Sequence, residues 1–116
     1  MTHKEALQDL LEKIKAGTPT ALDIATAFPK RGMETPYWFV RSICQNKDMN
    51  AARLLHEALR PEWRWSIHQP APGVSRVSIA PWSILRPVPY TAEHQEPAVA
   101  WLIAIITGEI ARCVND

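Results

Sequence analysis

The spacing of apolar residues changes from helical to strand-like within one short segment, residues 54–68. Up to Leu59 the apolar residues recur at helical spacing, whereas after Pro61 they alternate strictly with polar residues. A proline at such a change ends a helix, and an alternating aromatic run is typical of a strand. The segment therefore predicts a mixed fold of helices and strands.

Apolar spacing and capping residues predict five helices. Thr2 and Glu5 make a capping box at the start of the first helix, and Gly17 fits its end. Threonine and proline at 35–36 open the third helix, and Asp48 caps the fourth. The predicted helices lie within residues 2–17, 21–28, 35–45, 49–59 and 96–113.

For the second and third helices, the apolar pattern also predicts which side chains are buried. On the second helix we expect Leu22, Ala25 and Phe28 to be buried. The third helix begins with the consecutive aromatics Tyr37, Trp38 and Phe39, which span about 200° of the helix. They cannot all face one core, so at least one should be exposed or should cover another element.

Strand-like segments follow the fourth helix. Residues 62–69 and 74–80 alternate as two strands joined by a hairpin-length loop, and residues 83–86 fit a third, edge strand between two prolines. The predicted fold is thus α+β: four or five helices packed around a small antiparallel sheet of two or three strands. At 116 residues the chain should form a single domain, residues 1–116.

Alternation assigns the two faces of the first strand. The residues Trp63, Trp65 and Ile67 should point toward the core. The opposite, polar face is the best place for a ligand or partner, because arginines on it require an anion, a carboxylate or solvent. Candidate residues on that face are Arg64, Ser66, His68, Arg76 and Ser78.

A net charge of +1 hides a segregation of charge. Residues 1–29 have three lysines and four acids, residues 30–92 have nine basic residues and four acids, and residues 93–116 have one arginine and four acids. The basic middle could present a surface to an anionic partner or could form ion pairs with the terminal helices. We favour ion pairing.

The usual catalytic and metal-binding motifs are missing from the sequence. His56-Glu57 resembles the start of a zinc-protease helix, but position 60 is an arginine where that motif needs histidine. We expect His56 at the surface or its boundary. Cys44 and Cys113 are expected to be reduced core residues. We therefore predict a protein that is not an enzyme and that needs no metal or cofactor.

The sequence also bears on location. The apolar run at 97–108 is too short to cross a bilayer, and the charged, helical start of the chain is unlike a signal peptide. We expect a cytoplasmic protein without membrane partners.

One part of the chain resembles a known family. The segment from Ala51 to Ile67, with its helix-Pro-x-Trp-x-Trp-Ser-Ile junction, and the later run from Pro97 to Leu102 are similar to small phage and prophage proteins described as a phage α-β-α sandwich domain. The similarity covers roughly residues 50–110. It implies a fold and a phage setting, and no functional residues are carried over from it.

These observations predict a binding function. The expected protein is a phage or prophage accessory protein, of anti-CRISPR kind, that antagonises a host defence protein by direct contact. One alternative is a sponge, a small homo-oligomer that sequesters an anionic signalling nucleotide. A second alternative is a nucleic-acid-binding protein. The candidate contact residues are Arg64, His68, Arg76, Arg86, Trp38, Trp82 and Tyr90.

Overall fold

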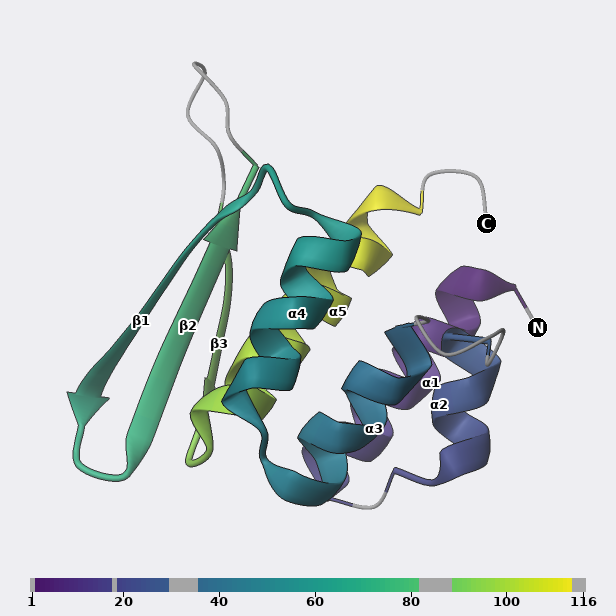
Figure 1. Ribbon diagram of the computed structural model, residues 1–116, viewed down its shortest axis with the longest axis horizontal. Coiled ribbons are helices and arrows are strands. Elements are labelled where there is room, and N and C mark those ends of the chain that lie inside the picture. Colours follow the sequence, from purple (N-terminus) through teal and green to yellow (C-terminus); the bar gives the residue numbers. More distant parts are fainter. Residues whose placement is uncertain (1, 18, 30–35, 82–88, 114–116) are drawn as a thin grey trace.

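The computed structural model describes residues 2–17, 19–29, 36–81 and 89–113. Five helices and three strands follow one another along the chain, in an α+β arrangement that confirms the predicted fold class (Figure 1). They are α1 (His3–Ala16), α2 (Ala21–Ala27), α3 (Pro36–Asn46), α4 (Met49–Leu59), β1 (Arg64–Ala71), β2 (Val74–Ala80), β3 (Tyr90–His94) and α5 (Pro97–Arg112).

Local capping explains where the first helices begin. The Thr2 hydroxyl accepts a hydrogen bond from Glu5 N at 3.1 Å, and the Glu5 carboxylate accepts one from Thr2 N. Thr20 and Asp23 repeat this box at α2. The bond from the Thr20 amide is the main cause that lowers the pKa of Asp23. These two capping boxes fix the helix starts independently of tertiary contacts.

The three strands form one antiparallel sheet in the order β1-β2-β3. β1 begins two residues later than expected, because Pro61 and Glu62 form a turn. It also extends through Pro70 to Ala71, leaving only Pro72 and Gly73 between the strands. Proline is tolerated in β1 because this is an edge strand that does not need every N–H for a ladder.

The second edge strand is a feature that the polar sequence did not suggest. β3 covers residues 90–94, a stretch expected to be a connection, and pairs with β2 over five residues. It has only one buried residue, Ala92, so its pattern of apolar residues is weak. The predicted strand at 83–86 lies outside the described residues.

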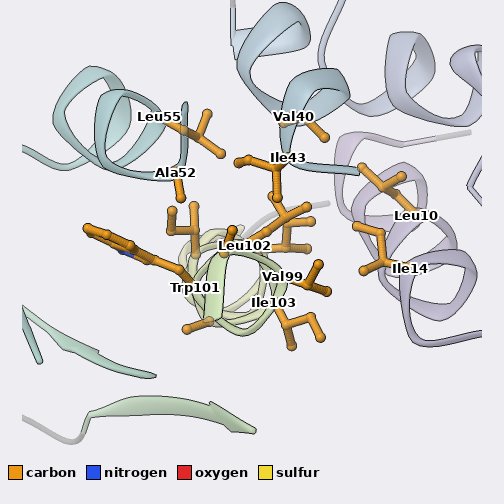
Figure 2. Close-up of a cluster of buried hydrophobic side chains, with 14 of the residues drawn as sticks. Leu10, Ile14, Val40, Ile43, Ala52, Leu55, Val99, Trp101, Leu102 and Ile103 are labelled. Carbon is orange, nitrogen blue, oxygen red and sulfur yellow. The ribbon is translucent and has the colours of Figure 1, made fainter. Parts of the chain in front are cut away.

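The core is built around α5. Val99, Leu102 and Ile103 extend from this helix toward its neighbours, and Leu55 and Ile43 face it from α4 and α3 (Figure 2). The other side of α5 packs on β2 and β3. All the described helices thus lie on one side of the sheet, unlike a sandwich with helices on both faces (Figure 1).

Two predicted burial assignments are wrong on the helices. Leu22 is 75 % exposed, and Ile24 and Ala27 are buried on α2 instead. A seven-residue helix with apolar residues on both sides does not reveal its buried face by periodicity. His56 is also wrongly assigned, since it is only 2 % exposed. It lies one turn after Ala52, on the face of α4 that meets α5.

No described helix is both long and apolar enough to span a membrane.

Candidate functional site

The outer face of the sheet, away from α5, is the candidate site. The register places Arg64 opposite Ala80, Ser66 opposite Ser78, and His68 opposite Arg76. On the other side of β2, Thr91 pairs with Ser78 and Glu93 with Arg76. One polar surface therefore crosses all three strands, and we call it the outer face. Its residues are Arg64, Ser66, His68, Arg76, Ser78, Thr91 and Glu93.

Arg76 lies on the outer face but already has an anionic partner. Its Nε donates a hydrogen bond of 2.7 Å to Glu93 Oε1. Of the anion, carboxylate or solvent expected beside this arginine, the structure supplies a carboxylate from β3. Both side chains are partly exposed, so the pair leaves polar groups at the surface while its net charge is zero.

The two strand arginines do not converge on one point. Arg64 is opposite Ala80, four residues along β2 from Arg76. At about 3.3 Å per residue, their backbones are about 13 Å apart along the strand. A single phosphate would have to be bound by one of them at a time. Arg64 lines a hollow of about 320 Å³ together with Ser66, Ser78 and Pro89.

The predicted aromatic core of β1 is only half correct. Trp63 is buried, but Trp65 is 47 % exposed and Ile67 only partly buried. β1 lies one strand beyond the part of the sheet that α5 covers. The Trp65 ring contacts Trp101 of the core, with ring centroids 4.5 Å apart.

Trp63 belongs to a closed cluster with Tyr90, which was expected to be exposed. The two rings stack with centroids 5.6 Å apart, and both lie against Gly108 of α5. A Cβ at position 108 would lie 2.9 Å from Trp63 Cζ3, so glycine is needed for this close approach. Tyr90 is thus a half-buried packing residue and not a free contact.

Charged groups complete the cluster around Trp63. Arg60 lies over the ring and donates from Nη2 to Glu109 Oε2 at 3.0 Å. Their Nε and Oε1 atoms are 2.8 Å apart in an ion pair that is not aligned as a hydrogen bond. Like Arg76–Glu93, this pair joins the basic middle of the chain to its acidic end. Of these two pairs, only Arg60–Glu109 joins the basic middle to a terminal helix as the ion-pairing interpretation expected, since Glu93 lies in β3.

His56 organises the junction between α4 and β1. Trp101 Nε1 donates to His56 Nδ1 at 3.3 Å, and His56 Nε2 is 2.8 Å from the carbonyl oxygen of Trp63. Because an indole nitrogen only donates, Nδ1 must accept and Nε2 must hold the proton. Both polar atoms of this buried imidazole are therefore satisfied in its neutral form, which fits a structural role.

The remaining candidates separate into two groups. Trp38 is half-buried, makes an edge-on contact with Tyr37 and lies beneath Arg41. It packs against the hydrophobic core and does not project as an anchor. Trp82 and Arg86 lie outside the described residues.

Cysteine and metal chemistry add no second site in the described part of the chain. Cys44 and Cys113 are not joined by a disulfide, and burial raises the pKa of the Cys44 thiol to about 11. That thiol is protonated at neutral pH and is a weak nucleophile. The described residues contain no group of three or more histidines, cysteines and acids that could hold a metal ion.

Fold and site together define an α+β protein with one polar sheet face that no described helix covers. Comparisons with family models, with curated proteins and with solved structures found no match. The similarity to phage proteins therefore stays a prediction.

Proposed function

We propose that this protein is a non-catalytic binding protein that contacts another protein through the outer face of its sheet. The observation that supports the proposal is that no described helix covers this face, although it crosses three strands. Small hydroxyl residues occupy its centre, with Ser78 and Thr91 joined by a 3.0 Å hydrogen bond. Charged side chains lie at both ends of this face, with Arg64 at one end and Arg76 and Glu93 at the other. Such a polar sheet surface, open across three strands, suits recognition of a protein better than enclosure of a small molecule.

The proposed setting is a phage or prophage, where the protein antagonises a bacterial defence protein in the host cytoplasm. This part of the proposal depends on the similarity of residues 50–110 to phage proteins. The outer face supplies the means, because blocking a host protein by contact requires a surface and no chemistry.

The test combines infection with binding. The protein should raise the efficiency of infection only in hosts that have a particular defence system. Tagged protein should retain a component of that system from infected lysate. Thr91→Arg and Ser78→Arg, both on the outer face, should reduce retention and infection at least tenfold. Leu22→Glu, on the far and exposed side of α2, is the matched control and should behave like wild type. Equal infection with and without the gene in every defended host would contradict the proposal.

A second candidate function is the binding of an anionic nucleotide. The hollow beside Arg64 and Ser66 favours it, since about 320 Å³ falls at the lower end of the range for ligand sites. A thermal shift with a panel of cyclic dinucleotides, lost in Arg64→Ala, would support this function over protein contact. No shift with any nucleotide would remove it.

A further inference from the structure

The edge of β1 is the largest unused hydrogen-bonding surface of the described structure. β1 has eight residues, and seven of them are exposed. It pairs with β2 along one edge, and no described strand pairs with the other. Figure 1 shows β1 as the element farthest from α1, α2 and α3, with space beside it. Such an edge presents backbone N–H and C=O groups to any strand that can reach it.

We propose that β1 pairs with β1 of a second copy, in antiparallel register, to form a continuous six-stranded sheet. This inference goes beyond the proposed function, because it concerns the edge of the sheet and not its outer face. The two-fold axis would pass midway between the Ile67 residues of the two copies, so that these two residues lie opposite each other. Ser66 would then pair with His68 of the second copy, so the regular part of the pairing covers residues 66–68, before the irregularity between His68 and Ala71.

The distribution of charge on β1 is compatible with a second copy in this register. β1 has one permanent charge, on Arg64, and no acid. Arg64 would lie near the irregular end of the second copy's β1, so the two arginines stay at opposite ends of the paired strands. Like charges directly opposite each other, which destabilise a sheet, are thus avoided.

Apolar surface also matches across the proposed pair. Trp65 and Ile67 point to the same side as the buried Val77 and Ile79, but both remain partly exposed in the single chain. In the paired sheet the two Ile67 side chains touch, and each Trp65 lies next to them. Pairing would therefore bury part of Trp65 and Ile67, which α5 does not cover because it packs only on β2 and β3.

The size of the contact predicts a weak dimer. One strand from each copy falls in the class of small interfaces, below about 1,200 Å² in total, which is typical of transient complexes. We therefore expect dissociation in the micromolar range. Dimerisation would also join two outer faces into one symmetric surface, with two equivalent contact sites for a partner.

Sedimentation velocity over a wide range of concentration tests the proposal. Wild type should move from the monomer mass of 13.1 kDa toward twice that mass. The double variant Ser66→Lys/His68→Lys places like charges opposite each other and should weaken dimerisation at least tenfold. Ser66→Glu/His68→Glu should do the same. Both positions are exposed, and Arg76, the cross-strand neighbour of His68, is already paired with Glu93, so both variants should fold. An equal mixture of the two variants should recover the dimer mass, because opposite charges now face each other.

Leu22→Lys is the control for adding a charge at an exposed position and should dimerise like wild type. A wild-type protein that stays at the monomer mass up to about 500 µM, far above the dissociation constant expected of a small interface, overturns the proposal. A dimer that neither double variant weakens also overturns it, since another surface would then join the copies. Neither outcome affects the outer-face test, which uses Thr91 and Ser78 on strands away from this edge.

Discussion

β1 and β2 are neighbouring strands of nearly equal length with similar alternation, yet they end in opposite environments. The inward residues of β2 are fully buried, with Val77 and Ile79 at most 1 % exposed. Their cross-strand partners on β1, Ile67 and Trp65, remain partly in water. The difference arises because α5 packs on β2 and β3 and stops short of β1. Position relative to one helix, and not the sequence pattern, decides which strand is core and which is surface.

The largest expected effect on stability comes from comparing Ile79 on β2 with Trp65, its cross-strand partner on β1. Ile79→Ala should lower the free energy of unfolding by about 2–5 kcal/mol, because it leaves a cavity beneath α5. Trp65→Ala should cost only about 1–2 kcal/mol, since about half of this larger side chain is already exposed and mainly its contact with Trp101 is lost. Urea unfolding followed by circular dichroism measures both. Equal losses would show that β1 is as firmly packed as β2.

A smaller effect on stability is expected from comparing His56 on α4 with His68 on β1, which lie on either side of the α4–β1 junction. His56→Ala should cost about 2 kcal/mol or more, because the Trp63 carbonyl and the Trp101 N–H lose their buried partner. His68→Ala, on exposed β1, should change stability by less than about 0.5 kcal/mol. Thermal melting of both variants at neutral pH provides the measurement. A harmless His56→Ala would mean that water replaces the imidazole.

The smallest effect concerns the ion pair that links β2 to β3. A double-mutant cycle of Arg76→Ala and Glu93→Ala should give a coupling of about 0.2–1 kcal/mol, which falls as salt is added. The exposed position of both side chains is the reason for the small value. The same cycle with Arg60 and Glu109, which are less exposed, is the comparison and should give a larger coupling. A coupling above about 1 kcal/mol for Arg76 and Glu93 would indicate that this ion pair is shielded from solvent, so that the outer face is less open than its exposed side chains suggest.

Much of the fold could be predicted from local signals. Capping boxes at Thr2 and Thr20 and the proline at 61 mark element ends through short-range hydrogen bonds and sterics, so they can be read directly. β3 could not be read in this way, because its five residues contain one buried side chain and form a strand only by pairing with β2. His56 could have been found, since it shares the helical face of Ala52.

The candidate site was predicted in part. Alternation correctly grouped Arg64, Ser66 and His68 with Arg76 and Ser78, since strand geometry alone fixes which side chains share a face. It did not reveal that Glu93 would reach Arg76, because that contact depends on where β3 is placed. Tyr90 was misjudged for the same reason: its stacking on Trp63 depends on the closeness of Gly108 on α5.

By itself the sequence determined the helices, two of the strands, the change of structure near Pro61 and the make-up of the polar strand face. These depend on backbone geometry and on residues a few positions apart. Only the tertiary structure decided that Trp63 is core while Trp65 is half in water, that the charged middle pairs with the C-terminal end, and that β1 is left as an open edge. The physical reason is that burial and pairing depend on which element lies alongside, and α5 covers two strands of the sheet but not the third.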